Sequence, residues 1–439
     1  MSVARPIIHQ TLDPLHRNWE YPEVIDSNTL LISTCMQPLV EFIPTEIIGL
    51  IIDEVVLADK KLGAFKTVKA CSLTCYAFLQ HSRRHIFSDI YAGETDKLLN
   101  FCNLLKDSPW IGQHVRSLWI VLPGRSYSFD QSLLSVHHHL KHMDQLKSIV
   151  IKGYSLEWTV DIPLSLRSTI VHLMHLPSVV DIRFIKIIAI SPLDLAPCNL
   201  HTLTMTSANF MDKCRPLQSI KCHKLYLEDV IPSQWIRHLQ KRKLFIDLKG
   251  LCIYLSSYIQ QSLYFQLLSD IPYLEELDLR ISDSTYSLFP SILAVPPPSL
   301  KCLKIRIHNS HLSMLTCLID RLKKVADTAG HLVQHLSFNV MSRSSSISQV
   351  PLIQDVLADS SKWPVLQRMS LRVYVRDMWP SYDAPEAGWE DDLKLRLRNF
   401  LENRQSNFGF FYSITDAWTE HYDEDDKIDW HEMVRNPAD

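Results

Sequence analysis

The chain has 439 residues, of which 46% are hydrophobic and 21% are charged, so it can bury a large core and lacks the composition of a disordered chain. Its 45 basic and 48 acidic residues give a formal charge of −3, which excludes the strong positive field that collects nucleic acids. The first residues, MSVARPIIHQTLDP, lack the apolar run of a signal peptide, and the apolar stretch IIGLIIDEVVLA is too short to span a bilayer. The ten cysteines do not have the regular spacing of a disulfide framework, which predicts reduced thiols and a cytoplasmic or nuclear location. Together with the charge and the lack of a membrane span, this predicts neither nucleic acid nor membrane as a partner.

Glycine is scarce, and this bears on catalysis. Ten glycines leave few positions for phosphate-binding loops, and the sequence contains none of the motifs G-x-G-x-x-G, G-x-x-x-x-G-K, G-x-S-x-G and H-E-x-x-H. We therefore expect no enzyme activity and no cofactor. The alternative, an enzyme with an unrecognised site, would require a cluster of buried, strongly perturbed titratable residues in one pocket.

The first 92 residues divide into a loosely ordered lead-in over 1–38, which carries Pro6, Pro14 and Pro22 and has little periodicity, and a helical module over 39–92. In that module, residues 42–57 read FIPTEIIGLIIDEVVL. Pro44 suits the first position of a helix, and Glu46 in the first turn favours the helix dipole. The apolar residues from Ile47 to Val56 cover more than half of the helix circumference. One apolar face is therefore left to pack on the following domain or to bind a protein partner.

Residues 67–90 predict a second helix, then a basic-polar turn and a third short helix that ends at Phe87. One side of the second helix carries Val68, Cys71, Cys75, Phe78 and Leu79.

Residues 39 to about 90 resemble the F-box, a three-helix motif. The family's opening pattern, L-P-x-E followed by hydrophobic residues, is matched by Ile43-Pro44-x-Glu46-Ile47-Ile48-x-x-Ile51-Ile52. Its second-helix pattern is matched by Cys71-Ser72-Leu73-x-Cys75 with Phe78, and the third helix by Ser82-Arg83-Arg84-His85-Ile86-Phe87. The family usually has tryptophan where Phe78 stands and often arginine where Tyr76 stands.

The resemblance implies that this module binds the Skp-type adaptor of a Skp–cullin–F-box ubiquitin ligase complex. The downstream repeats would then hold an unknown target protein, and other subunits would carry out the chemistry. The alternative is a module that packs internally, in a protein-binding scaffold not attached to a ubiquitin ligase. The adaptor-binding residues implied by the resemblance are Ile43, Pro44, Glu46, Ile47, Ile48, Ile51, Leu73 and Phe78.

From residue 110 to 415 the pattern changes to short pieces that alternate apolar and polar residues, separated by helix-like stretches. Ten pieces end in a leucine-x-leucine type pair, and most have an apolar residue three places earlier, which is the L-x-x-L-x-L frame of a leucine-rich repeat. The first members follow one another at intervals of 21 to 33 residues. The pairs are Leu118/Ile120, Ile149/Ile151, Ile182/Phe184, Leu203/Met205, Leu225/Leu227, Ile246/Leu248, Leu277/Leu279, Leu303/Ile305, Leu336/Phe338 and Met369/Leu371.

Such a unit is one strand and one return helix, and neighbouring units must stack to bury its apolar side. We therefore predict an α/β chain in which a three-helix F-box precedes an irregular leucine-rich-repeat-like solenoid with a parallel sheet. This order is also similar to that of the expanded F-box families of mushroom-forming fungi. An ordinary α/β domain whose strands begin with leucine is the alternative. The expected return helices are Ser132–Asp144, Ser233–Lys241, Gln260–Ser269, Met314–Ala326 and Pro351–Asp359.

The residues that flank the leucines are expected to point away from the core. In the later units several of them are basic and would lie close together if the strands stack in order, forming a face for an acidic or phosphorylated target segment. The alternative is a solvated surface whose charges are offset by Glu276, Asp278 and the acidic tail or cap predicted over 416–439. The basic residues are Arg280, Lys304, Arg306, Arg368 and Arg372.

Two groups of residues have metal-ligand chemistry but incomplete sets. His138 and His142 would lie one turn apart on a helix, with no third ligand identifiable nearby. Cys214, Cys222 and His223 lack the paired C-x-x-C spacing of structural zinc sites. We therefore predict no metal site.

Overall fold

The computed structural model divides the chain into two compact units, Met1–Arg83 and Arg84–Asp439. It describes residues 43–62, 66–124, 129, 131–211, 219–228, 245–255, 273–281, 297, 299–310, 319–320, 322–323, 326–327, 332–342, 362–375 and 409–416. The lead-in over 1–38 and nearly all of the tail over 416–439 lie outside these residues, as do most of the return helices predicted after residue 228.

The described part of the first unit is helical. Helix α2 (Thr45–Leu62) packs on α3 (Lys66–Ser72), and α4 (Tyr76–Ile86) follows, with its last turn in the second unit. The sequence sets this packing, because Ile48, Ile52 and Val56 recur every four residues on one face of α2, and all three are buried together with Val68 of α3. An apolar core of one residue per turn thus stabilises the α2–α3 pair.

The predicted second helix is wrong in its extent, because it ends at Ser72 instead of continuing to Leu79. The hydroxyl of Ser72 donates to the Lys69 carbonyl at 2.6 Å, and that of Thr74 donates to the Cys71 carbonyl at 2.7 Å. These local bonds satisfy carbonyls that a continuing helix would use, so they favour a turn. Phe78 consequently lies on α4, in a different helix from Val68.

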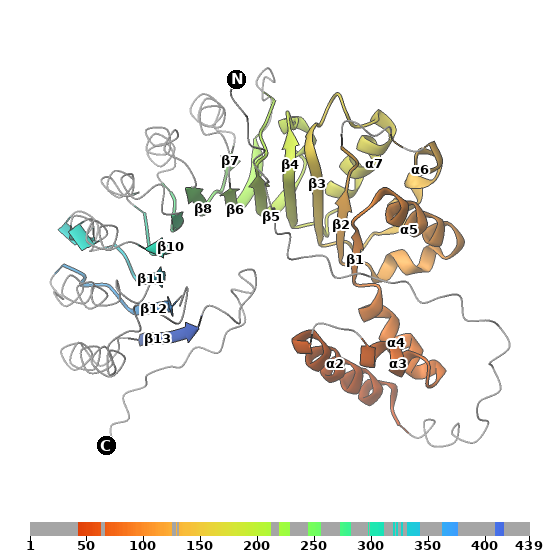
Figure 1. Ribbon diagram of the computed structural model, residues 1–439, viewed down its shortest axis with the longest axis horizontal. Coiled ribbons are helices and arrows are strands. Elements are labelled where there is room, and N and C mark those ends of the chain that lie inside the picture. The colour runs from red at the N-terminus through yellow and green to blue at the C-terminus, as the bar shows by residue number, and fades with distance from the viewer. Residues whose placement is uncertain are drawn as a thin grey trace, which may run out of the picture. The chain divides into compact units, whose positions relative to one another are not determined.

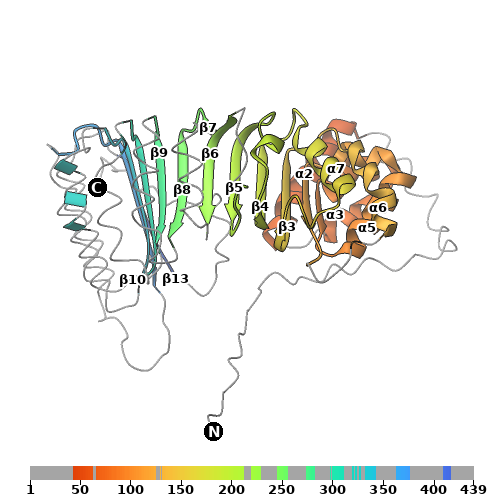
Figure 2. The same ribbon diagram turned by 90° about the horizontal axis from the view of Figure 1, so that it is seen from above.

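The second unit contains a parallel β-sheet that has 13 strands in the part of the chain that the structure describes. Twelve of them lie side by side in chain order, and β7 pairs with β6 outside this order (Figures 1 and 2). The strands are β1 (Asp89–Ala92), β2 (Ser117–Val121), β3 (Ser148–Glu157), β4 (Asp181–Ile188), β5 (Asn199–Thr206), β6 (Ile220–Glu228), β7 (Phe245–Ile246), β8 (Gly250–Leu255), β9 (Glu276–Ile281), β10 (Cys302–Ser310), β11 (His335–Ser342), β12 (Arg368–Val375) and β13 (Gly409–Asp416). The predicted α/β class with a parallel sheet is confirmed.

Nine of the ten predicted apolar pairs lie on these strands and face one another across the sheet. For example, Leu277 pairs with Leu303, and Leu303 pairs with Leu336, so the first members form a continuous row. The apolar residue three places earlier forms a second buried row. Its members are Val115, Leu146, Val179, Leu200, Cys222, Leu248, Leu274, Leu300, Val333 and Leu366.

The pair Ile246/Leu248 is the exception, and its prediction is wrong. The residues that continue the rows are Leu251 and Ile253 on β8, which pair with Leu225 and Leu227. Leu248 therefore begins its frame instead of ending it. With this frame the interval from Leu225 to Leu251 equals the two intervals that follow it, at 26 residues each.

A repeated backbone contact holds the starts of the strands in register. The amides of Glu275 and Glu276 both donate to the carbonyl of Lys249, at 2.8 and 2.9 Å, and those of Lys301 and Cys302 both donate to the carbonyl of Glu275, at 2.8 and 2.9 Å. Each such carbonyl thus uses both of its acceptor positions on the next unit. The same double contact is made by the carbonyls of Ser88, Arg116, Lys147, Val180, Lys301 and Gln334.

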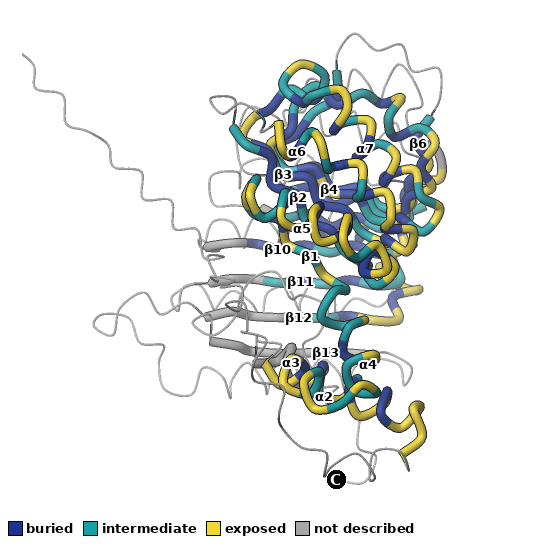
Figure 3. The backbone as a smooth tube through the Cα atoms, turned by 90° about the vertical axis from the view of Figure 1, so that its right-hand side faces the viewer, coloured by how far each residue is buried: buried dark blue, intermediate teal, exposed yellow. Residues whose placement is uncertain are grey.

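Helices cover one face of the first strands (Figure 1). They are α5 (Thr95–Asp107), α6 (Gln131–Val136) and α7 (Leu164–Met174), with the 3₁₀ helices η1 (Pro109–His114), η2 (His137–His142) and η3 (Pro192–Asp194). The core lies between them and the sheet, where Leu98 of α5 and Ile170 of α7 join Leu118 and Ile149 of the strands. Figure 3 marks the buried positions of β3 and β4 in dark blue. No described helix is long and apolar enough to cross a membrane.

The opposite side of the sheet, here called the non-core face, carries the residues that alternate with the core rows. Ile182 and Ile185 on β4 give a matched test of the two sides, since Ile182 is buried in a core row and Ile185 is half-buried on the non-core face. We expect Ile182→Ala to lower the free energy of unfolding of the sheet unit by about 2–5 kcal/mol, because it removes buried methyl groups and leaves a cavity. Ile185→Ala should cost less than about 1 kcal/mol, since its surroundings are partly solvent. Denaturant unfolding of the two variants measures the difference, and equal losses would contradict the assignment of the faces.

Candidate functional site

An exposed apolar stripe runs along helix α2. Ile47, Leu50, Ile51 and Leu57 have 45%, 61%, 40% and 55% of their surfaces exposed, and they lie beside the buried row of Ile48, Ile52 and Val56. The helix therefore carries more apolar surface than its own unit buries. Such a surface in a small helical module is typical of a protein-binding site.

The start of α2 explains how this stripe is positioned. Pro44 immediately precedes the first helical residue, and its carbonyl accepts hydrogen bonds from the amides of Ile47 and Ile48 at 3.0 and 3.2 Å. Glu46 lies in the first turn, where a carboxylate favours the positive end of the helix dipole. The pattern I-P-x-E-I-I therefore fixes the beginning of the helix and with it the direction of both apolar rows.

The predicted adaptor-binding residues have different environments. Ile43, Pro44, Glu46, Ile47 and Ile51 are exposed around the start of α2. Ile48 is buried instead, so it supports the stripe from within the unit. Leu73 lies in the turn between α3 and α4 with 78% of its surface exposed, and Phe78 is half-buried on α4.

The non-core face of strands β6 to β12 carries a second group of functional candidates. One cross-strand row contains Glu228, Tyr254, Arg280, Arg306, Asn339 and Arg372. The row two residues earlier contains Tyr226, Cys252, Asp278, Lys304, Ser337 and Ser370. The sheet thus brings side chains from distant parts of the sequence to about 4.8 Å from one another at the backbone.

Ion pairs offset much of the positive charge on this face. Glu276 contacts the ammonium groups of Lys224 and Lys304, each at 2.8 Å, and Arg306 Nη2 lies 3.2 Å from Asp278 Oδ2. Two of the five predicted basic residues are therefore paired with neighbouring carboxylates. The described part of the face is a mixed-charge network instead of a continuous basic patch.

The other predicted basic residues occupy separate positions. Arg280 is next to Arg306 across the strands β9 and β10. Arg368 is exposed at the beginning of β12, opposite His335. Arg372 lies opposite Asn339, and its side chain is outside the described residues.

The electrostatics centre on Glu276. Burial by itself would raise the pKa of its carboxyl group, but the hydrogen bonds and charges of Lys224 and Lys304 outweigh burial and hold this pKa below its ordinary value. Burial would likewise lower the pKa of each lysine, and Glu276 reverses the direction and raises both. All three groups are consequently charged at neutral pH, and two lysines share one carboxylate.

The buried thiols have no features of catalytic nucleophiles. Burial raises the pKa of Cys102, Cys198 and Cys222 to about 12, so these groups are protonated at neutral pH. Their side chains fill core positions, as Cys222 does in the row of Leu200 and Leu248. Packing as small apolar groups is the role expected for cysteines whose irregular spacing does not fit a disulfide framework.

The two groups of possible metal ligands are arranged differently from the sequence prediction. Residues His137–His142 form a 3₁₀ helix, so the rings that stack one turn apart are those of His139 and His142, with centroids 5.9 Å apart, instead of His138 and His142. Cys222 and His223 are adjacent on β6, so they point to opposite faces of the sheet, while Cys214 lies outside the described residues. In the part of the chain that is described, no three His, Cys, Asp or Glu side chains come together in a metal-binding group.

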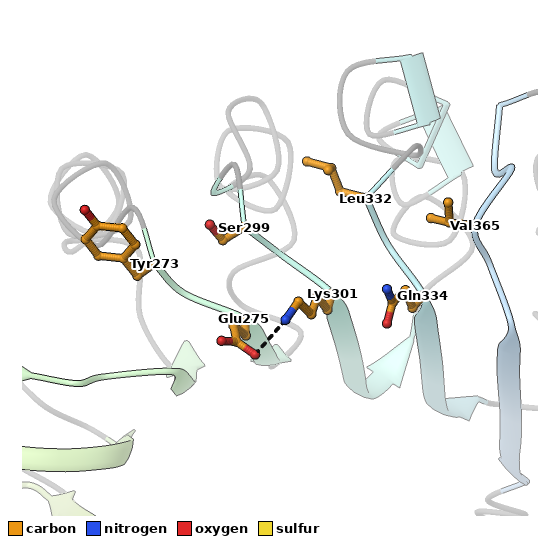
Figure 4. Close-up of a pocket in the computed structure, with 7 residues that line it drawn as sticks. All are labelled: Tyr273, Glu275, Ser299, Lys301, Leu332, Gln334 and Val365. Atoms are coloured by element: carbon orange, nitrogen blue, oxygen red, sulfur yellow. Dashed lines mark hydrogen bonds and ion pairs between the residues drawn. The ribbon is translucent and has the colours of Figure 1, made fainter.

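A pocket of about 310 Å³ lies along the edge of the sheet where β9 to β12 begin (Figure 4). Tyr273, Leu332 and Val365 supply apolar surface, and the ion pair between Lys301 Nζ and Glu275 Oε2, at 3.1 Å, lies among them. This site was not predictable from a motif, because its residues precede the strands and follow no recognised pattern. In the sequence these residues are marked only by their position, two or four residues before the first member of each core pair.

No model of a known protein family matches the chain, and no curated protein matches it. Function must therefore be argued from the α2 stripe and the non-core face.

The Glu276 network predicts a defined pH dependence. Because the folded-state pKa of Glu276 is lowered, its contribution to stability is present above the unfolded pKa of about 4.3 and is lost as the pH falls through the folded value. We expect Glu276→Gln to reduce the free energy of unfolding at pH 7 by about 1–3 kcal/mol, between the values for exposed and fully buried pairs. The difference from the unchanged protein should shrink as the pH is lowered from 5 to 3.

The matched control is Glu275→Gln, which removes the neighbouring carboxylate from the exposed edge and should cost less than Glu276→Gln at pH 7. Denaturant unfolding between pH 3 and pH 7 measures both variants. A Glu276→Gln effect that stays constant over this range would contradict the role of the charged carboxylate.

Proposed function

We propose that the chain is the substrate-recognition adaptor of a Skp–cullin–F-box ubiquitin ligase. Its helical unit docks on a Skp-type adaptor, and its sheet unit binds a target protein. The observation that carries the proposal is the exposed stripe of α2, in which Ile47 and Ile51 stand at hydrophobic positions of the F-box opening pattern.

The size of the stripe agrees with a stable dock. Burial of an aliphatic side chain contributes about 1.5–3 kcal/mol, whereas association costs about 4–15 kcal/mol. Ile47, Leu50, Ile51 and Leu57 together with Ile43 are each about half-exposed, so their complete burial contributes roughly half of that amount per residue, which meets the lower end of the association cost. Glu46 borders this surface at the start of the helix, whereas Glu54 lies within it, one turn from Leu50 and Leu57, so a partner has to meet this carboxylate with a polar group.

The sheet unit supports the second half of the proposal. Core rows that continue from strand to strand, and carbonyls that each serve two amides of the next unit, favour a leucine-rich-repeat-like solenoid. In such a solenoid the non-core face is an extended surface for a partner. Apart from Cys302, the paired residues of β9 and β10 on it are charged, as suits a protein-binding face in water.

The mechanism requires no bond-making residue in this chain. An adaptor that holds a target beside a charged ubiquitin-conjugating enzyme raises the effective concentration of the target's lysines, and the chemistry belongs to other subunits. Buried, protonated thiols and an apolar docking stripe fit this role better than catalysis. The complex would act in the cytoplasm or nucleus.

Replacement of both stripe residues tests the docking half. We expect Ile47→Asp together with Ile51→Asp to weaken binding of a purified Skp-type adaptor by about 100-fold or more, because two apolar anchors become charges that stay solvated. The buried row behind them is unchanged, so the helical unit should keep its fold. Binding is measured by calorimetry, and folding by circular dichroism.

Leu164→Asp together with Leu193→Asp is the matched control, since both leucines are exposed in the second unit. This variant should bind the adaptor normally. If the α2 variant also binds normally, the ligase proposal fails. If no form of the chain binds the adaptor, the alternative of a repeat scaffold outside the ubiquitin system is supported.

A further inference from the structure

The pocket at the starts of β9 to β12 is a groove between two rows of side chains (Figure 4). The residues of the outer row stand four positions before the first member of each core pair, and those of the inner row stand two positions before it. Tyr273 in the outer row has 78% of its surface exposed and Val365 has 36%, so a segment from outside can reach the groove while the core stays closed. The outer row contains Tyr273, Ser299, Leu332 and Val365, and the inner row contains Glu275, Lys301 and Gln334.

The outer row is more apolar here than on the preceding strands. Tyr273, Leu332 and Val365 occupy it before β9, β11 and β12, although a position at this edge is not part of the core. The stacking of the strands therefore does not explain these apolar side chains, and an exposed cluster of this kind indicates a binding surface. On β2 to β6 and on β8 the same position carries polar residues, namely His114, Gln145, Ser178, Asn199, Lys221 and Asp247.

Ser299 gives the groove a gap. It precedes β10 and lies in the outer row between Tyr273 and Leu332, because β10 pairs with β9 and with β11. Its small side chain leaves room for a larger side chain of a ligand between the tyrosine and the leucine. The starts of the four strands span three intervals of about 4.8 Å, which is about 14 Å in all. An extended segment covers this length in about four residues.

The backbone at this edge is already paired. The carbonyls of Glu275, Lys301 and Gln334 each accept two amides of the following strand, and the amides of the same residues donate to the preceding strand. A ligand therefore gains no hydrogen bonds from these groups, and side chains must recognise it.

The inner row has room for one more carboxylate. Lys301 and Lys249 share Glu275, with N–O distances of 3.1 and 3.7 Å. The hydrogen bond and charge of Lys301, together with those of Lys249, hold the pKa of Glu275 below its ordinary value, so this carboxyl group is charged at neutral pH. Gln334, on the other side of Lys301, is neutral, and Asp247 lies two strands away from Lys301. A carboxylate of a ligand can thus pair with Lys301 while Glu275 keeps Lys249.

We propose that this groove binds an extended segment of the target in which a large apolar residue is followed directly by an acidic one. The apolar side chain packs over Ser299 between Tyr273 and Leu332, and the carboxylate pairs with Lys301. Successive side chains of an extended segment point to opposite sides, which matches an apolar outer row and a charged inner row. The inference rests on the proposed function, in which the sheet unit holds the target.

The experiment uses synthetic peptide libraries of random sequence in which two adjacent central positions are fixed as Leu-Glu, Leu-Gln or Ser-Glu, each incubated with the full-length chain. We expect the Leu-Glu library to be retained about tenfold more than either of the others. The loss of a buried aliphatic side chain and the loss of a charge-assisted hydrogen bond each lower affinity by about that factor.

Tyr273→Ser together with Val365→Ser should remove the preference for Leu-Glu over Ser-Glu, because both apolar walls of the groove are lost. The matched control is Tyr154→Ser together with Val180→Ser. It replaces an exposed tyrosine and a valine that is 36% exposed, as Val365 is, and both lie at β3 and β4 outside the groove. This control should keep the preference.

A charge reversal separates binding from folding. Lys301→Glu should lower retention of the Leu-Glu library and raise retention of a fourth library fixed as Leu-Lys, a gain that a damaged fold does not produce. Equal retention of all libraries by the unchanged chain would overturn the proposal. So would a preference that survives the Tyr273 and Val365 replacements, or a Lys301→Glu chain that still retains Leu-Glu better than Leu-Lys.

Adaptor binding by the unchanged chain, measured in parallel, distinguishes this inference from the proposed function. Normal adaptor binding without any library preference would overturn the groove and leave the docking function standing. A Leu-Glu preference without adaptor binding would support the groove and count against the ligase.

Discussion

The structure depends on one constraint, which is that a single strand with its connecting segment cannot bury its apolar side without a neighbour. The second unit meets this constraint by strict register. Leu277, Leu303 and Leu336 face one another on successive strands, and the carbonyls of Lys249, Glu275 and Lys301 fix the strand starts by serving two amides each. Any shift by one residue would move a whole core row to the opposite face. Register therefore determines both the core and the composition of the non-core face.

The polar network follows from the same register. Glu276 precedes its core leucine by one residue, and Lys224 precedes its own by the same offset, so the two lie on one side of the sheet although they are far apart in the sequence. The carboxylate of Glu276 then joins Lys224 to Lys304 across β6, β9 and β10. A mixed-charge surface of this kind is fixed in position by the backbone beneath it, which makes it suited to specific recognition.

Much of the sheet was predictable because the period-2 alternation and the leucine frame are local signals. The prediction from the frame was wrong at β8, where Ile246 and Leu248 imitate the pair although Leu248 is the first apolar residue of the frame and not the last. The predicted extent of the second helix was wrong at Ser72. There the hydroxyl groups of Ser72 and Thr74 donate hydrogen bonds to backbone carbonyls, and these bonds favour a turn although the apolar periodicity continues. Arg280, Lys304 and Arg306 alternate with the core leucines, but the ion pairs they form or lack depend on cross-strand distances that spacing in the sequence does not give.

The two candidate surfaces differ in the physics by which they would bind. The α2 stripe offers aliphatic side chains, whose burial contributes affinity without strong directional demands, and this suits a constant partner that every copy must hold. The non-core face offers hydrogen-bonding groups held at fixed positions, where a wrong ligand leaves such groups without partners. In the proposed function, discrimination among targets would therefore belong to the sheet and permanent attachment to the helix. This division of roles would follow from where the chain exposes apolar surface and where it presents polar groups.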